Sequence, residues 1–415
     1  MRRDIDSPYA WLRLAIALVI SGIGGVGMWS VVVSLPAVQA GFGADRGAAT
    51  LPYTCVSVGI GLGSLLMGRL LDRVGLIKPL LIGATTLGAG YVLASLSGSI
   101  RTYAAIHLFI GMFGSAATFV PIVSDISLWF ERRRGIAVAL ASSGSYVAGV
   151  FWPSLIELMI QAHGWRYAHL MIGIICVVTI PPLALLLRGP GPSRAPGAPP
   201  PLAPRRRVDL PPRTLQALLA VAGLACCVAM SMPQVHIVAY CGDLGYGAAS
   251  GARMLSLMLG FGIVSRIASG FLSDRVGGLV TLLIGSVAQM VALLLYLSMD
   301  GLAELYVISS LFGLFQGGLV PSYAIIVREN FPAGQTGSRV GLILTMTLLG
   351  MGLGGWMSGV IYDWTGSYLA AFANGVAWNV GHLMITLFLL SRSYAPTRQG
   401  APRSAVPLVV GGNGR

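Results

Sequence analysis

The 415-residue chain is 55% hydrophobic and only 10% charged, whereas a soluble domain carries roughly 25% charged residues. A water-soluble protein of this length could not bury so much apolar surface in one core, so the composition excludes that class. The net charge of +13 is high enough to suggest a nucleic-acid-binding protein. The distribution of the basic residues along the chain argues against that function.

Apolar stretches of about 20 residues recur along the whole chain, and each is long enough to cross a bilayer as a helix. We therefore predict an all-α membrane protein with twelve transmembrane helices. The expected spans are 11–33, 48–67, 79–97, 102–128, 135–160, 167–187, 214–240, 248–272, 279–298, 302–327, 339–361 and 368–390.

The basic residues are distributed unevenly between the two sides of these spans. With the amino terminus placed inside the cell, 22 of the 27 basic residues fall in tails and cytoplasmic loops. One, Arg266, lies inside a helix, and four lie at or near outer loops, namely Arg46, Arg101, Arg166 and Arg253. This asymmetry predicts that both termini are cytoplasmic. High Gly, Ala and Arg content with short loops indicates a bacterial inner membrane, so we expect a multi-pass protein there.

A proline-rich polar segment divides the chain into two halves. Residues 188–213 are too rich in proline to form a helix and predict an extended cytoplasmic linker. We expect a six-helix half at 1–187, a second at 214–392, and a disordered cytoplasmic tail at 393–415.

One short motif occurs in both halves. Residues 68–75 read GRLLDRVG and residues 270–277 read GFLSDRVG, 202 positions later. This pattern resembles the signature loop of the major facilitator superfamily, which implies two six-helix halves with a solute site between them. The resemblance assigns gating to the four charged residues Asp72, Arg73, Asp274 and Arg275. A solvated turn would explain their charges but would not explain the duplication.

Further motifs are similar to the monocarboxylate porter family. Residues 129–144 read WFERRRGIAVALASSG, and 6–11 read DSPYAW, a degenerate copy of that family's opening motif. The resemblance continues at 164–166 (GWR) and at 236–245 (HIVAYCGDLG). Oxalate/formate antiporters share much of this pattern. The resemblance implies transport of a small organic monocarboxylate, with a proton as the coupled ion.

Arg266 is the most informative single residue. It precedes Asp274 by eight positions, which places it about 12 Å further into the bilayer on a helix. A buried Arg is costly unless it faces protein, water or an anion. Its planar guanidinium binds a carboxylate through two hydrogen bonds. In the monocarboxylate porters, an arginine at this place binds the substrate carboxylate. The alternative is a permanent salt bridge from Arg266 to Asp125 or Glu157.

Three positions depart from the family pattern. Animal members carry an Asp one turn before the arginine, where this chain has Gly262. The family's lysine in the first helix is missing from 29–36, and 340–361 lacks the second cation that oxalate antiporters place there. A single carboxylate therefore suits the site better than two, because a second anionic end would be desolvated without a partner. The missing Asp leaves the proton's route open.

Two aromatic residues are weaker candidates for substrate binding. Tyr323 lies about 12 Å inside Phe331 and resembles an aromatic residue of the family's site. Core packing with a satisfied hydroxyl is the alternative for Tyr323. Phe119 could line the cavity near the middle of its helix, but a single Phe more often packs in a core.

Three titratable residues inside helices are candidates for proton coupling. Asp125 lies toward the cytoplasmic end of its helix and could instead pair with the loop that carries Arg73. His107 and His236 could each be protonated, although a single helical histidine is more often only a hydrogen-bonded residue.

The chain shows no phosphate-binding loop, no metal-ligand spacing and no nucleophile elbow, so we expect no cofactor, no metal and no enzymatic activity. The expected partners are a small organic anion, a proton and the lipid bilayer, with no nucleic acid and no obligatory protein partner. Transport would use a solute or ion gradient through alternating access. The alternatives are an organic anion exchanger or drug efflux carrier of the same fold, and a non-transporting membrane sensor.

Overall fold

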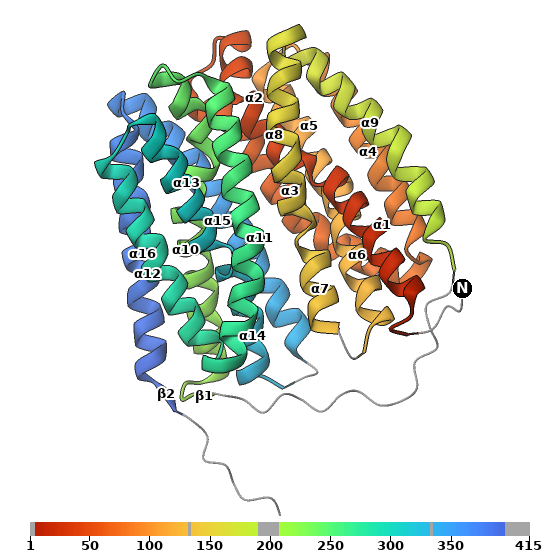
Figure 1. Cartoon of the computed structure of the whole chain (residues 1–415), viewed down its shortest axis with the longest axis vertical. Coiled ribbons are helices and arrows are strands. Elements are labelled where there is room, and N and C mark those ends of the chain that lie inside the picture. Colours follow the sequence, from red (N-terminus) through yellow and green to blue (C-terminus); the bar gives the residue numbers. More distant parts are fainter. Residues whose placement is uncertain (1–4, 132–133, 190–206, 333–334, 395–415) are drawn as a thin grey trace, which may run out of the picture.

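A computed structural model describes residues 5–131, 134–189, 207–332 and 335–394. Within these ranges, twelve helical spans are long and apolar enough to cross a membrane, which confirms the predicted number. Six of these spans end by Leu186 and six begin at Pro212 or later. The two groups lie on opposite sides of the molecule in Figure 1. The fold is thus an all-α membrane protein of two six-helix halves.

In the first half, three of the six spans are interrupted, and each interruption divides one span into two or three labelled helices. The helices are α1 (Pro8–Gly24) with α2 (Val26–Phe42), α3 (Arg46–Val74), α4 (Ile77–Ser95), α5 (Ile100–Phe109) with the π-helix η1 (Ile110–Ser115) and α6 (Ala116–Trp129), α7 (Arg134–Ser142) with α8 (Gly144–His163), and α9 (Trp165–Leu186).

The second half has one interrupted span. Its helices are α10 (Pro212–Asp243), α11 (Ala248–Val276), α12 (Gly278–Ser298), α13 (Leu302–Gln316) with α14 (Leu319–Asn330), α15 (Thr336–Thr365) and α16 (Tyr368–Ser391). Two short strands, β1 (Arg207–Val208) and β2 (Ser393–Tyr394), pair antiparallel beside these helices.

Several helices extend beyond the spans expected from hydropathy. The first membrane span runs from Pro8 to Phe42 rather than over 11–33, and α3 begins at Arg46 and ends at Val74 rather than covering 48–67. Hydropathy detects only the stretch that suits hydrocarbon, whereas the hydrogen-bonded helix continues into the polar surroundings.

The two halves repeat the same close helix crossing. A Cβ atom on Gly111 would collide with the carbonyl oxygen of Val56, so η1 and α3 touch through their backbones. A Cβ atom on Gly313 would likewise collide with the carbonyl oxygen of Met258, where α13 meets α11. Gly313 follows Gly111 by 202 positions, and Met258 follows Val56 by the same number. This is also the offset between the two copies of the repeated sequence motif.

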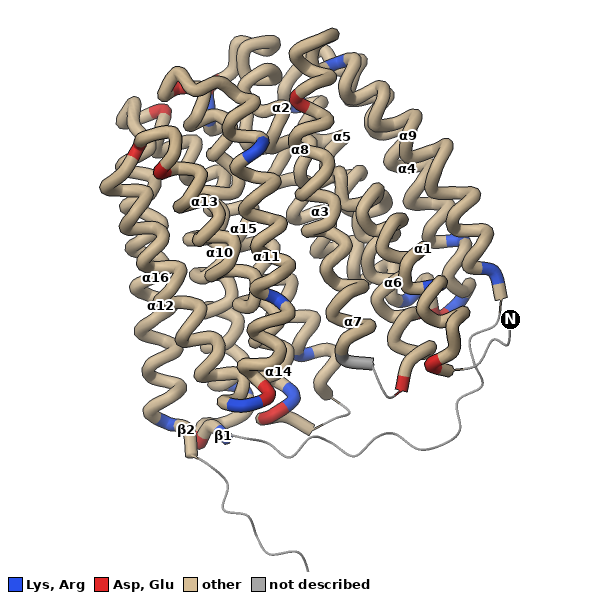
Figure 2. The backbone as a smooth tube through the Cα atoms, in the orientation of Figure 1, with Lys and Arg blue, Asp and Glu red and all other residues tan. Residues whose placement is uncertain are grey.

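The two sides of the molecule can be named by what they carry. We call the side where α9 ends and α10 begins the linker side, and the side where α2 ends and α3 begins the far side. Most charged residues lie toward these two sides, with a mainly uncharged band between them (Figure 2). Helix pairs α3–α15, α8–α11 and α2–α10 make the most extensive contacts between the halves.

The ends of the expected linker and tail are more ordered than predicted. Arg207 pairs with Tyr394 and Val208 with Ser393, while the Asp209 N–H donates to the Arg392 carbonyl at 2.9 Å. The start of the expected disordered tail, 393–394, is therefore a strand. Residues 190–206 and 395–415 lie outside the described residues.

Candidate functional site

Arg266 lies on α11 where this helix faces α8 of the other half. Its Nη1 donates a hydrogen bond to the Ser142 carbonyl at 2.9 Å. Its Cζ lies 4.0 Å from the centre of the Tyr146 ring, so the guanidinium makes a cation–π contact. Both partners belong to the first half, and the half-buried Arg266 side chain therefore bridges the two halves.

The Ser142 carbonyl can accept this bond because the fifth span is interrupted there. Helix α7 ends at Ser142 and α8 begins at Gly144. The Tyr146 N–H donates to the Ser143 carbonyl at 2.9 Å, a tighter turn than the α-helical bond to Ser142. The carbonyl at the end of α7 thus points its partial negative charge at the Arg266 guanidinium.

The rest of the Arg266 guanidinium forms no hydrogen bond or ion pair with the residues that the structure describes. Nε is buried and makes no hydrogen bond to any described residue. The ion pairs recorded over the described ranges do not include Arg266. Asp125 pairs with Arg13, and Glu157 accepts a bond from Gln161 Nε2 at 3.0 Å. The two acids weighed as permanent partners of Arg266 are therefore engaged elsewhere.

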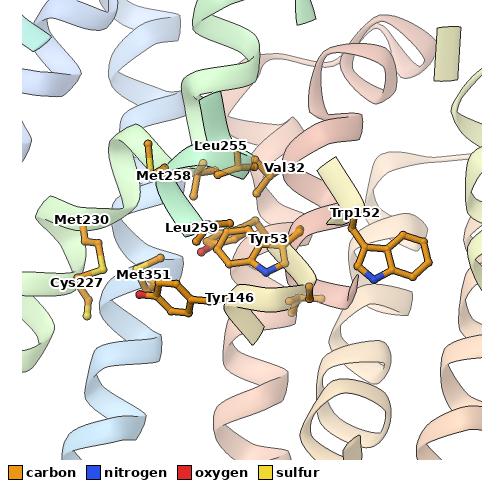
Figure 3. Close-up of a cluster of buried hydrophobic side chains, with 14 of the residues drawn as sticks. Val32, Tyr53, Tyr146, Trp152, Cys227, Met230, Leu255, Met258, Leu259 and Met351 are labelled. Carbon is orange, nitrogen blue, oxygen red and sulfur yellow. The ribbon is translucent and has the colours of Figure 1, made fainter. Parts of the chain in front are cut away.

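Gly262, one turn before Arg266, leaves room for Tyr146. A Cβ atom at this position would collide with the Tyr146 ring. Figure 3 shows the Tyr146 side chain reaching from its own helix toward Met351. An aromatic ring from the first half thus occupies the space beside Gly262, where the resemblance led us to look for an Asp.

Asp125 forms a buried pair with Arg13 on α1. Arg13 Nε and Nη2 donate to the two carboxylate oxygens of Asp125 at 2.7 and 2.9 Å. The expected pairing of Asp125 with the loop of Arg73 is wrong. Arg266 is also not the sole basic residue within the spans, because the Arg13 side chain is only 1% exposed. The carboxylate and the Leu187 carbonyl satisfy the donors of Arg13, which offsets the cost of burying its guanidinium.

The two aromatic candidates lie in different surroundings. Tyr323 on α14 is buried, and its hydroxyl is 3.0 Å from His382 Nε2 on α16. His382 Nδ1 in turn lies 2.8 Å from the Ser286 hydroxyl. Tyr323 thus belongs to a polar network inside the second half, the arrangement expected of a packed residue with a satisfied hydroxyl. Phe119 is half-buried on α6.

Both histidine candidates are fully buried. His107 Nδ1 lies 2.8 Å from the Tyr103 carbonyl, and its Nε2 has no hydrogen-bond partner among the described residues. His236 uses both ring nitrogens, Nδ1 at 3.0 Å from the Tyr368 hydroxyl and Nε2 at 2.9 Å from the Gly355 carbonyl. His236 therefore ties α10 to α15 and α16 near the far side.

Three charged residues close the far side. Arg46 begins α3, and its Nη1 and Nη2 donate to the two carboxylate oxygens of Asp243 at 3.0 and 3.2 Å. The Asp363 carboxylate accepts from the backbone N–H groups of Arg46 and Gly47 at 2.8 and 2.7 Å. Asp363 thus caps a helix of the opposite half, at the end that attracts anions. We call Arg46, Asp243 and Asp363 the far-side clasp.

The repeated loops on the linker side do not pair in this structure. Asp72, Arg73, Asp274 and Arg275 are exposed, and none of them forms an ion pair with any residue in the described ranges. The final glycine of each motif has a positive φ, 74° at Gly75 and 86° at Gly277. Glycine adopts this conformation without strain, which allows the sharp turn between the two helices that each motif connects. Within the described part of the chain, charged residues therefore join the halves at the far side, and no ion pair of these loops joins them.

Sequence reasoning missed Tyr146, Ser142 and the far-side clasp. Ser142-Ser143-Gly144 gave a local signal for an interrupted helix, but nothing local indicated its contact with Arg266. The clasp residues could have been noticed as charged residues at the outer ends of three spans, although their pairing depends on the tertiary fold.

Comparisons with known proteins agree with this architecture. The family model described as Major Facilitator Superfamily matches residues 17–303 and 268–412. Monocarboxylate transporter 13 of Bos taurus is 29% identical over 332 residues, which are 76% of this chain and 75% of that protein. Monocarboxylate transporter 11 of Homo sapiens is 25% identical over 389 residues, 88% of this chain and 80% of that protein. The crystal structure of the nucleoside transporter NupG has a TM-score of 0.71 at 15% identity and covers 92% of this chain and 99% of its own.

Proposed function

Because this chain belongs to the Major Facilitator Superfamily, we propose that it is a secondary transporter that carries a small organic monocarboxylate by alternating access. The family and the monocarboxylate transporters among its relatives support the class of function. The single observation that supports a carboxylate substrate is the state of Arg266. It is a cation within a membrane span, and its Nε has no partner among the described residues. An anion reaching the interface between the halves would satisfy that donor.

The contacts between the halves support a cycle in which the substrate site opens to one side at a time. With the far-side clasp formed and the linker-side loops unpaired, the site opens toward the linker side. Binding of the anion neutralises Arg266 and lowers the cost of enclosing it. The Asp72/Arg73 and Asp274/Arg275 loops then close the linker side while the clasp opens.

Coupling to a proton follows the family resemblance, with Asp125, His107 and His236 as its candidates. The structure favours one alternative, exchange of anions without a proton. Gly262 stands where animal members have an acid, and Tyr146 occupies the adjacent space. Counterflow of a labelled monocarboxylate separates anion exchange from proton symport. An exchanger takes up the label only when an anion is present inside, whereas a symporter responds to an imposed pH gradient. A drug efflux carrier would show neither response.

The binding claim is tested by thermal unfolding of the purified protein with a panel of small mono- and dicarboxylates. We expect monocarboxylates such as pyruvate to raise the melting temperature in a concentration-dependent manner. Dicarboxylates such as succinate should do so less. A protein that responds to no carboxylate would contradict the proposed substrate class, and the sensor alternative would then be tested by searching for other ligands.

We also propose that the linker side faces the cytoplasm of a bacterial cell and that the protein resides in the inner membrane. The excess of basic residues in the segments on that side supports this orientation. Reporter fusions within 190–206 and after 395 should both report cytoplasm, and a fusion near Arg166 should report the opposite side.

A further inference from the structure

Two groups of the first half hold the Arg266 guanidinium in one orientation. We propose that Ser142 and Tyr146 are positioning residues that present the Nε/Nη2 edge of Arg266 to one substrate carboxylate. This inference rests on the proposed function and deepens it, because it specifies how the anion binds and why a single carboxylate suits the site.

The Arg13 site in the same molecule shows this arrangement with a carboxylate in place. Arg13 Nη1 donates to the Leu187 carbonyl at 2.9 Å, just beyond the end of α9. Its guanidinium lies over the Trp129 ring, with Cζ 4.7 Å from the ring centre. The remaining edge, Nε and Nη2, binds both oxygens of the Asp125 carboxylate. A ring, a helix-end carbonyl and one carboxylate together satisfy this arginine.

Arg266 has the first two of these three components. Its Nη1 donates to the Ser142 carbonyl at 2.9 Å, at the end of α7. Its guanidinium lies over the Tyr146 ring at 4.0 Å. The corresponding edge begins with Nε, which makes no hydrogen bond within the described residues. By analogy with Asp125, the partner that fits this edge is a planar carboxylate bound side-on.

The geometry also limits the number of carboxylates. A stacked ring covers one face of the guanidinium but leaves its in-plane N–H groups available. Because Ser142 engages Nη1, Nε and Nη2 remain as the pair of parallel donors for a bidentate carboxylate. One carboxylate uses both donors. Arg266 therefore offers no equivalent edge for a second carboxylate of the same ligand.

Gly262 takes part because it determines where the Tyr146 ring can lie. A Cβ atom at Gly262 would collide with this ring, so Gly262→Ala should displace the ring from the Arg266 guanidinium. Gly260, two positions earlier on α11, provides a matched control. A Cβ atom there would meet Val150 at 3.7 Å, an ordinary van der Waals contact.

The test measures pyruvate affinity by isothermal titration calorimetry, with succinate as the dicarboxylate, on the full-length protein in detergent. Tyr146→Leu should weaken pyruvate binding about tenfold, between the effects expected for an exposed and for a fully desolvated cation–π contact. Tyr146→Phe keeps the ring and should restore affinity to within about twofold of wild type. Gly262→Ala should weaken binding about tenfold, and Gly260→Ala should bind like wild type.

A double variant separates positioning from general destabilisation. If Gly262 acts through Tyr146, adding Gly262→Ala to Tyr146→Leu should weaken pyruvate binding no further. Melting temperatures measured without ligand identify variants that fail to fold. If Tyr146→Leu fails to fold, the Gly262→Ala and Tyr146→Phe proteins still test the positioning role.

The two proposals fail in distinguishable ways. A wild-type protein that binds neither pyruvate nor succinate overturns the proposed function and this inference with it. A wild-type protein that binds pyruvate, together with folded Tyr146→Leu and Gly262→Ala variants of unchanged affinity, overturns the positioning role alone.

Discussion

Removing the Asp125 carboxylate should destabilise the protein far more than an ordinary polar substitution. The Arg13 and Asp125 side chains are 1% and 11% exposed, and two hydrogen bonds of 2.7 and 2.9 Å join them. Asp125→Ala leaves the Arg13 charge buried without its partner, which costs about 3–5 kcal/mol. At roughly 2 °C per kcal/mol, the melting temperature should fall by about 6–10 °C.

The assay is thermal unfolding in detergent, followed by tryptophan fluorescence, for Asp125→Ala, Arg13→Ala and the double variant. The double variant should melt above at least one of the single variants, because it leaves neither charge unpaired. The exposed Asp72→Ala serves as a control and should melt like wild type. If Asp125→Ala melts like wild type but loses the response of uptake to a pH gradient, Asp125 is a proton carrier and the structural role is refuted.

Three further outcomes follow from the gates and the helix crossings. Asp363→Asn should speed hydrogen exchange in the first turn of α3, because the cap weakens; unchanged exchange would show that the cap does not hold that turn. Asp72→Asn and Asp274→Asn should lower net uptake while pyruvate affinity persists, and loss of affinity in a folded variant would place them in the site instead. Gly111→Ala should lower the free energy of unfolding by about 1–3 kcal/mol, because the added Cβ collides with α3. Gly68→Ala serves as the control and should be neutral, since a Cβ there has no neighbour within 4 Å. Equal stabilities of these two variants would argue against the close crossing.

The number of spans and the repeat were predictable because their signals are local. A stretch of about 20 apolar residues needs no tertiary information to be identified as a membrane helix. The two copies of the G-x-x-x-D-R-x-G motif lie at 68–75 and 270–277, and each can be read from eight consecutive residues. The structure adds that the same offset relates the glycine crossings at Gly111 and Gly313.

The environment of Arg13 could not be predicted in the same way. Arg13 lies at the start of the expected span 11–33, directly after a polar, charged amino-terminal segment, so it was counted with the basic residues of that segment. Its partner Asp125 is 112 positions away, and its other acceptor is the backbone carbonyl of Leu187. A backbone acceptor leaves no mark in a sequence. Only the packing of α1 against α6 and α9 brings these groups together.

The surroundings of Arg266 were hidden for the same reason. Sequence reasoning identified the cation from its depth and from the family resemblance. Tyr146 and Ser142 lie in the other half, at separations of 120 and 124 positions. The sequence showed only that Gly262 stands where animal family members have an Asp. The structure gives a steric reason for a glycine at this position, because the Tyr146 ring occupies the adjacent space.

The central claim is that Arg266 binds the substrate carboxylate, and calorimetric titration of Arg266 variants with pyruvate tests it most directly. Arg266→Lys retains the charge but loses the planar edge, so affinity should fall at least tenfold, equivalent to 1.4 kcal/mol or more. Arg266→Gln should abolish measurable pyruvate binding while the protein stays folded. An Arg266→Gln protein that binds pyruvate with wild-type affinity would contradict the account.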